Sequence, residues 1–293
     1  MIVVTTPTGH IGTKLVADLL ATGQPVRVIA REPAKLAPEV RAKVEVVQGS
    51  SDDEDVVMRA ADGAESFFLV VPPSFTTEDP REYYLRFTRP VCRAIERKGV
   101  KRVVAVSGIG RRVSVNAGLV TASLEKDVAI ERTGVDFRAL WCPGFMENML
   151  RQIDALRHQS AFFGPFRADL KIPLAATRDI AASGARLLLD RRWTGQGGLA
   201  VLGPENLSPH DMAAILSEVL GKPIRFQTVP HEAYKAQLIG MGASEACAQA
   251  MIDMSAAKND GLDLSEPRTR ENTTPTTFRQ WCEEVLKPAV LSR

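Results

Sequence analysis

Small residues and two glycines follow a short apolar run near the start of the chain. Ile2-Val3-Val4 leads into Thr5-Thr6-Pro7-Thr8-Gly9-His10-Ile11-Gly12, and apolar residues at helical spacing follow from Leu15 to Leu20. A strand that turns through small residues into a helix can bind an anion, because the first N–H groups of the helix lack partners and lie at the positive end of its dipole. The alternative is an ordinary turn between a strand and a helix.

A second apolar run ends at a cation. Residues 25–30 predict a second strand, Arg31 follows it directly, and Lys35 lies one helical turn further on. In dinucleotide-binding folds the residue after the second strand faces the adenosine ribose. There an acid accepts a hydrogen bond from the 2′-hydroxyl, whereas an arginine pairs with a 2′-phosphate. Arg31 and Lys35 therefore favour NADP(H) over NAD(H). The alternative is a solvated surface arginine, whose field the adjacent Glu32 weakens.

Strand-like runs alternate with helical patterns in the first half of the chain. Further strands are expected at 43–47, 66–71, 102–107 and 137–141, and helices at 79–98 and 123–132. This alternation predicts βα units and a doubly wound parallel α/β sheet of the Rossmann type, with helices on both faces. The cofactor of such a sheet binds at the C-terminal ends of the strands.

Beyond Pro143 the alternation becomes less regular. A helix is expected at 179–189, a strand near 198–203 and a further helix capped by Ser208, with Asp211 in the capping-box position. We expect residues 1–150 to form an NADP-binding domain to whose sheet the strand near 198–203 returns. Residues 151–293 are expected to form a smaller, mostly helical substrate-binding lobe.

The composition excludes several classes of protein. The 37 basic and 35 acidic residues give a net charge of +2, which offers no electrostatic footprint for nucleic acid. No apolar run is long enough to cross a membrane, and no signal-peptide pattern is found. The four cysteines and four histidines are scattered without metal-ligand spacing, so no metal site is expected. We therefore expect a cytoplasmic protein with reduced thiols.

Several short motifs are shared with a known family. They are Thr5–Gly12, Arg31, Gly99–Val104, Thr133–Phe137, Pro143–Asn148, Thr177–Ala181 and Thr274–Phe278. On these residues the chain resembles the NmrA-like family of atypical short-chain dehydrogenase/reductases, over nearly its whole length. Within that family it is most similar to the branch of NADPH-dependent quinone reductases and triphenylmethane dye reductases. The resemblance implies NADP(H) as the cofactor.

The resemblance also implies a set of cofactor-binding residues. In the family the loop reads Gly-x-x-Gly-x-x-Gly, and Thr6 stands here at the first glycine. A threonine disfavours positive φ and Pro7 has no N–H, so we expect a stiffer loop that still binds phosphate, with one backbone contact fewer. Ser50 stands where the family often has an adenine-contacting aspartate, so that contact is not expected. The residues expected around the pyrophosphate and 2′-phosphate are Thr6, Thr8, Gly9, His10, Ile11, Arg31 and Lys35, and those around the ribose and nicotinamide are Val71, Pro72, Ser107, Pro143 and Phe145.

The Tyr-x-x-x-Lys pair with which the larger superfamily reduces carbonyls is missing. Its positions fall at Leu119 and Ser123, and the three tyrosines lie elsewhere in the chain. Lys126 is expected as a solvated charge on an exposed helix face, and Asp127 stands where relatives commonly carry a glutamate. No catalytic side chain is therefore assigned.

This absence restricts the acceptor. Reduction of an ordinary ketone is slow when the developing alkoxide is not neutralised. A quinone yields a delocalised, weakly basic anion and a cationic dye becomes neutral, so either can accept hydride in an apolar slot without a side-chain acid. Candidates for that slot are Phe145, Asn148, Met149, Phe163, Phe166 and Met241, the alternative being that the apolar ones pack a core between the lobes.

We therefore predict an NADPH-dependent oxidoreductase that transfers hydride to a quinone or a similar planar, conjugated aromatic acceptor. One alternative is a non-catalytic NADP(H) sensor that acts through a regulatory protein partner, as the founding regulator of the family does. Another is an enzyme of secondary metabolism that reduces an enone, an imine or a polycyclic quinone. A homodimer is compatible with each of them, and the sequence alone does not choose the oligomeric state.

Overall fold

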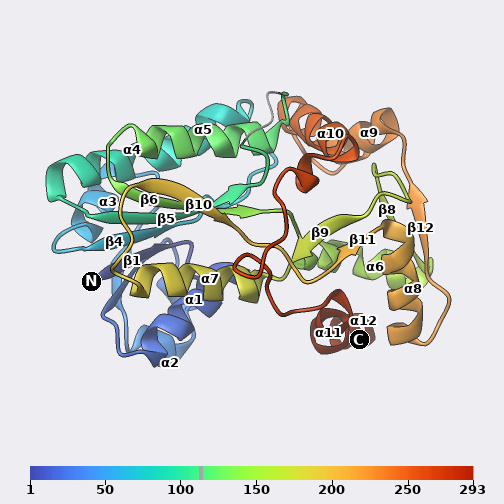
Figure 1. Ribbon diagram of the computed structural model, residues 1–293, viewed down its shortest axis with the longest axis horizontal. Helices are drawn as coiled ribbons and strands as arrows, with labels where there is room; N and C mark the ends of the chain where they lie inside the picture. The colour runs from blue at the N-terminus through green and yellow to red at the C-terminus, as the bar shows by residue number, and fades with distance from the viewer. Residues whose placement is uncertain (112–114, 293) are drawn as a thin grey trace.

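A parallel sheet of seven strands forms the centre of the molecule. The computed structural model describes residues 1–111 and 115–292. The strands lie in the order β10-β6-β5-β4-β1-β2-β3, and every neighbouring pair is parallel (Figure 1). Their bounds are β1 Ile2–Thr5, β2 Val26–Ala30, β3 Glu45–Gln48, β4 Ser66–Leu69, β5 Arg102–Gly108, β6 Asp136–Cys142 and β10 Gln196–Ala200. The strand order reverses beside β1, which is where ligands bind in sheets of this kind.

Helices cover both faces of this sheet. On one face lie α1 (His10–Ala21) and α7 (Thr177–Leu189); on the other lie α3 (Glu54–Ala60), α4 (Pro80–Lys98) and α5 (Leu119–Glu131) (Figure 1). The short segments Pro33–Lys35 and Pro38–Arg41 (α2) connect β2 to β3. The predicted doubly wound α/β architecture is confirmed.

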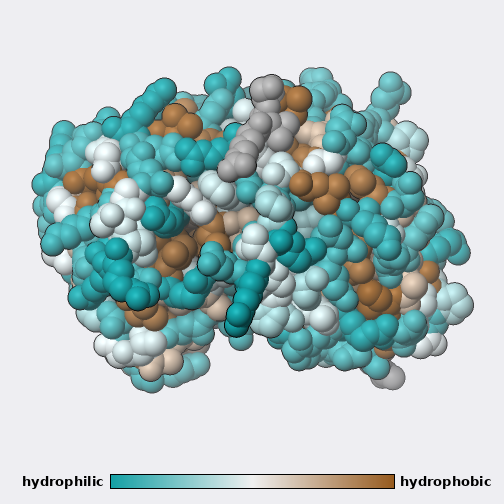
Figure 2. Space-filling view, viewed as in Figure 1, coloured by the Kyte–Doolittle hydropathy of each residue, from teal (hydrophilic) through white to brown (hydrophobic). Residues whose placement is uncertain are grey.

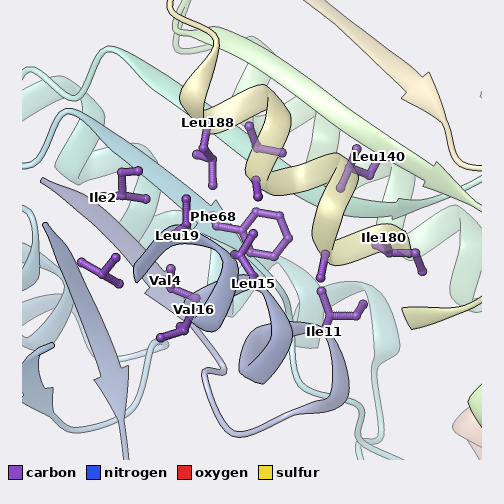
Figure 3. Close-up of a cluster of buried hydrophobic side chains, with 14 of the residues drawn as sticks. Ile2, Val4, Ile11, Leu15, Val16, Leu19, Phe68, Leu140, Ile180 and Leu188 are labelled. Atoms are coloured by element: carbon purple, nitrogen blue, oxygen red, sulfur yellow. The ribbon is translucent and has the colours of Figure 1, made fainter. Parts of the chain in front are cut away.

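Successive residues of the strands supply the cores of the two faces. Val4 belongs to the cluster beneath α1 and α7, together with Leu15 and Phe68 (Figure 3). Val3 belongs to the cluster beneath α3, α4 and α5, together with Phe67. Side chains alternate between the faces of a strand, and a strand buried on both faces is therefore apolar throughout. The continuous apolar runs in the sequence have this cause.

Several predicted boundaries differ from the structure by a few residues, among them those of β4 and α5. The fourth strand ends at Leu69 and not at Val71, because side chains replace the ladder there: the Val70 N–H donates to Thr5 Oγ1 at 2.9 Å, and Thr6 Oγ1 donates to the Val70 carbonyl at 2.8 Å. Helix α5 begins at Leu119, four residues before the predicted start at 123. Gly118, with φ of 53°, precedes it.

The remaining residues form a second lobe with its own core. Phe278 and Trp281 are buried there beneath α8. Ser208 caps α8 in a capping box with Asp211, as predicted. The lobe also holds two small sheets, β11-β9-β7 and β12-β8, whose strands of two to four residues are too short for the sequence pattern to predict. Its strands are β7 Gly144–Phe145, β8 Ala161–Gly164, β9 Ile172–Ala175, β11 Asn206–Leu207 and β12 Arg225–Thr228; its helices are α6 Ile153–His158, α8 Pro209–Leu220, α9 His231–Gly240, α10 Glu245–Asn259, α11 Phe278–Trp281 and α12 Lys287–Leu291, with shorter helical turns at Met146–Gln152, Leu262–Leu264 and Cys282–Leu286.

The chain passes between the two lobes more than once. After β6 it enters the second lobe, returns to the sheet through α7 and β10, and then leaves again (Figure 1). β10 pairs in parallel with β6, and α7 packs against α1. The boundary near residue 150 stays a prediction. Within the described residues, no helix is both long enough and apolar enough to cross a membrane.

Candidate functional site

The N-terminus of α1 is open toward the end of β1. Gly9 caps this helix with extended backbone, no side chain accepts from its first N–H groups, and its first turn holds no acidic residue. By contrast, Asp79 caps α4, Ser208 caps α8 and Ser244 caps α10, each by a side-chain hydrogen bond. The free N–H groups and the helix dipole of α1 therefore suit a phosphate group. This donor set fits the pyrophosphate of a dinucleotide.

The loop before α1 packs closely against the helix. A Cβ atom on Gly12 would lie 2.2 Å from the Thr6 carbonyl oxygen, so only glycine fits there, whereas a Cβ atom on Gly9 would meet nothing nearer than 3.4 Å. Thr6 has φ of 52°, the left-handed conformation that the family's glycine adopts freely and a threonine disfavours. Hydrogen bonds hold it there: its hydroxyl donates to the Val70 carbonyl, and its carbonyl accepts from the Gly9 N–H at 3.2 Å.

The other predicted cofactor residues follow or end neighbouring strands. Arg31 comes directly after β2, Val71 and Pro72 come after β4, Ser107 lies near the end of β5, and Pro143 follows β6. Because these strands are parallel, all of these residues lie at one edge of the sheet. The structure therefore places these residues at the edge of the sheet at which the glycine loop also lies.

The two predicted phosphate-binding cations differ in their surroundings. Lys35 donates to Glu32 at 2.8 Å, and this contact lowers the pKa of the Glu32 carboxyl. Arg31 is exposed and has no ion-pair partner within the described part of the chain. Arg31 is thus the cation that is available to a 2′-phosphate.

Tyr83 on α4 was not predicted as a site residue. Its hydroxyl donates to the Pro72 carbonyl at 3.1 Å, and the Arg86 guanidinium lies 5.2 Å from its ring centroid. Arg86 in turn pairs with Asp52 at 3.0 Å. Burial raises the pKa of Tyr83. Only the folded arrangement reveals this residue, because its contact with Pro72 depends on how α4, the next helix along the chain, packs beside the segment after β4.

Lys126 is completely buried, which corrects the expectation of a solvated charge. Its Nζ donates to Asp127 Oδ1 at 2.5 Å, and the Ser107 hydroxyl donates to Asp127 Oδ2 at 2.5 Å. The hydroxyl oxygens of Ser107 and Ser123 lie 3.3 Å apart. The expectation was wrong because α5 packs against β5, β6, α4 and α10 and so has little exposed face, and because the adjacent carboxylate compensates the buried cation.

Helix α5, which carries three members of this cluster, contains no tyrosine. Leu119 and Ser123 occupy the first and fifth positions of α5, and the three tyrosines lie on α4 and α9. Burial raises the pKa of the Cys142 thiol, the neighbour of Lys126 and Asp127, well above its usual range, so that it stays protonated. In the described ranges, no group of three His, Cys, Asp or Glu residues is arranged to hold a metal ion.

The predicted substrate residues occupy different environments. Phe145 in β7 is half-buried against the core beneath α1 and α7, and Asn148 is exposed. Met149 is buried in the core of the second lobe, whereas Met241 is 76% exposed at the end of α9. Phe163 in β8 and Phe166 after it are half-buried. Their contact with a substrate stays a prediction.

A cavity of about 680 Å³ lies between the start of α4, the residues before α5 and helix α10. Asp79, Asn116, Gln249 and Asp253 contribute polar groups to its wall. It includes none of the predicted cofactor or substrate residues. Figure 2 shows that hydrophilic residues predominate on one face of the molecule, with smaller hydrophobic patches among them.

The parallel sheet and the open, glycine-lined helix at its switch point define a Rossmann-type NAD(P)-binding protein. Residues 1–282 match the NmrA-like family, and the chain belongs to this family. A (4-alkanoyl-5-oxo-2,5-dihydrofuran-3-yl)methyl phosphate reductase of Streptomyces griseus is 30% identical over 292 residues, 97% of each chain. An NAD(P)H azoreductase of Xenophilus azovorans is 28% identical over 257 residues, 87% of this chain and 86% of that protein. The fold is similar to an NADPH-dependent quinone oxidoreductase of Escherichia coli complexed with NADPH, with a TM-score of 0.80, 24% identity, and 98% and 100% of the two chains covered.

Proposed function

We propose that this protein is an NADPH-dependent oxidoreductase that transfers hydride to a quinone or a similar conjugated aromatic acceptor. One observation carries the proposal. The open N-terminus of α1 and the exposed Arg31 lie at the same edge of the sheet, and helix α5 contains no tyrosine. Membership of the NmrA-like family supports it, as do the relatives that are named as reductases.

The cofactor would be held by the residues that the strand ends bring together. The N–H groups of His10 and Ile11 at the start of α1, with the loop from Thr6 to Gly9, would bind the pyrophosphate, and Arg31 would pair with the 2′-phosphate. Val71, Pro72, Ser107, Pro143 and Phe145 would hold the nicotinamide nucleoside and keep water from it. NADPH, when bound, supplies the hydride.

The acceptor follows from the side chains that are missing. Helix α5 has no tyrosine to protonate an alkoxide, and the Cys142 thiol is buried. The Tyr83 phenol at this edge already donates its hydrogen to the Pro72 carbonyl. A substrate whose reduced form is a delocalised, weakly basic anion can take its proton from water afterwards. Phe145, Asn148, Met149, Phe163 and Phe166 are proposed to line its slot.

The test is NADPH oxidation by the purified protein, followed at the nicotinamide absorbance. The acceptor panel holds simple quinones, an azo dye, a triphenylmethane dye and a simple ketone, and NADPH binding is titrated in the same preparation. We expect turnover with a conjugated acceptor and little with the ketone. Tight binding of NADPH without turnover of any acceptor would contradict the proposed enzymatic activity. It would favour a sensor that acts through a protein partner.

Two finer proposals accompany this function. Cysteines 92, 142, 247 and 282 are free thiols, which is compatible with a reducing, cytoplasmic location. A homodimer is proposed as one working form, and light scattering of the purified protein would establish whether one chain or two are present.

A further inference from the structure

A chain of buried polar groups runs from α5 to the end of β5. Lys126 is 0% exposed, and Ser107, Ser123 and Asp127 are each at most 6% exposed. One oxygen of the Asp127 carboxylate accepts from the Lys126 ammonium, and the other accepts from the Ser107 hydroxyl. Both contacts are 2.5 Å long. Such charge-assisted hydrogen bonds are short and strong, and they fix the geometry of the weaker partner.

The directions of these bonds decide what Ser107 can do. An ionised carboxylate only accepts, so the single hydroxyl hydrogen of Ser107 is committed to Asp127. If Ser107 and Ser123 also bond across their 3.3 Å, Ser123 must be the donor. Toward any other group, Ser107 offers only lone pairs. A hydroxyl that rotates freely would offer either role.

Helix geometry explains why these residues converge. Ser123 lies three residues before Lys126 and four before Asp127, so all three can share the face of α5 that meets β5. The lysine position of the superfamily pair falls at Ser123, and the cation of this chain lies one helical turn further on. Lys126 is completely buried, so any influence on a bound cofactor would pass through Asp127 and Ser107.

We propose that Lys126 and Asp127 are positioning residues that fix Ser107 as a hydrogen-bond acceptor for an N–H or O–H donor on the nicotinamide nucleoside half of NADPH. The donor is a ribose hydroxyl or the carboxamide N–H. The pair thereby holds the nicotinamide ring in register for hydride transfer. This inference rests on the proposed binding of NADPH at the strand ends, but not on turnover.

The informative variant combines Lys126→Met with Asp127→Asn, which removes both charges and keeps the side-chain shapes. Removal of one partner alone would leave a buried, unpaired charge. Its affinity is measured calorimetrically for NADPH, for 2′-phospho-ADP-ribose and for 2′,5′-ADP. We expect the NADPH dissociation constant to rise about tenfold. Affinity for 2′,5′-ADP, which lacks the whole nicotinamide nucleoside, should be unchanged. A loss that extends to 2′-phospho-ADP-ribose identifies a ribose hydroxyl as the donor, and a loss confined to NADPH identifies the carboxamide.

Ser107→Ala tests whether the pair acts through Ser107. Added to the native protein it should weaken NADPH binding about as much as the double variant does, and added to the double variant it should have little further effect. Additive losses would overturn the proposal. If the double variant does not fold, Ser107→Ala alone should still weaken the binding of NADPH more than that of 2′,5′-ADP. Equal losses of affinity for the two ligands would overturn the proposal.

A second buried pair provides the matched control. Lys258 Nζ donates to both carboxylate oxygens of Asp263, at 2.6 and 2.5 Å, at the end of α10. Lys258→Met with Asp263→Asn should leave NADPH affinity unchanged within about twofold. An unchanged NADPH affinity in the folded Lys126 and Asp127 double variant would overturn the proposal. Failure of the proposed function shows separately, as absence of turnover in the native protein that binds NADPH.

Discussion

Lys126 and Asp127 are adjacent in sequence and form an ion pair from which water is excluded. The Lys126 side chain is 1% exposed and that of Asp127 is 8% exposed, at a distance of 2.5 Å. Two opposite charges at this depth compensate each other, whereas either one alone would be a buried charge without a counterion. The pair therefore links α5 to the Ser107 hydroxyl near the end of β5.

Removing only one of these charges should destabilise the protein strongly. We expect Lys126→Met to lower the free energy of unfolding by about 3–5 kcal/mol, because Asp127 is left without its cation. Adding Asp127→Asn should restore part of that loss. Urea denaturation checks both values, with Arg192→Gln at the exposed pair with Asp190 as the control that leaves stability unchanged. Equal losses of stability in the single and double variants would show that the two charges do not compensate each other.

Arg31 should decide the preference between cofactors. Arg31→Ala should raise the NADPH dissociation constant about 10–100-fold and leave that of NADH nearly unchanged, because only NADPH carries the 2′-phosphate. Lys35→Ala is the matched control and should have a smaller effect, since Glu32 already pairs with Lys35. Equal losses for NADPH and NADH would refute the 2′-phosphate assignment.

The strain at Thr6 can be separated from its hydrogen bond. Thr6→Ala removes the bond to Val70 and keeps a side chain at φ of 52°, whereas Thr6→Gly removes the bond and relieves the strain. We expect the glycine variant to be more stable than the alanine variant by about 1 kcal/mol. Thermal denaturation of the two proteins measures the difference, and an alanine variant as stable as the glycine variant would argue against strain.

The two glycines at the start of α1 should respond differently to a methyl group. Gly12→Ala would place its Cβ 2.2 Å from the Thr6 carbonyl and must displace the loop, so we expect a large loss of NADPH affinity and of stability. Gly9→Ala, with φ of −81° and no contact under 3.4 Å, should preserve stability. Comparable losses of stability in the two variants would show that the loop is not packed as described.

Alkaline pH should destabilise the protein through its tyrosines. Burial raises the pKa of Tyr84 to about 12 and also raises those of Tyr83 and Tyr234. Between the usual pKa near 10 and these raised values, the tyrosines of the folded state bind more protons than those of the unfolded state. Their contribution to stability is therefore full below about pH 10 and falls as pH rises toward 12. Tyrosinate absorbance against pH, followed with circular dichroism, measures this. Tyr84→Phe should remove the tyrosinate titration step that has the highest pKa. Ionisation of all three tyrosines near pH 10 in the folded protein would contradict the prediction.

The position of the expected cofactor-binding residues at one edge of the sheet could be predicted because its signals are local. The glycine loop is contiguous in sequence, and Arg31, Val71 and Pro143 each follow an apolar strand, so parallel topology alone brings them together. The Lys126 cluster could not be predicted, since burial of a helix face depends on the four elements that pack against α5. Tyr83 likewise donates a hydrogen bond to the Pro72 carbonyl from the following helix, and a contact of this kind leaves no periodic pattern in the sequence.

The return of the chain through α7 and β10 has a consequence for how the molecule can be divided. A chain cut after residue 150 would lose both elements. β6 would become an exposed edge strand with unpaired N–H and C=O groups, and the apolar side chains of α1 that α7 covers would face water. Such a fragment would be prone to aggregate. Residues 1–150 and 151–293 are therefore not exchangeable modules, because α7 and β10 from the second range complete the sheet and the core of the first.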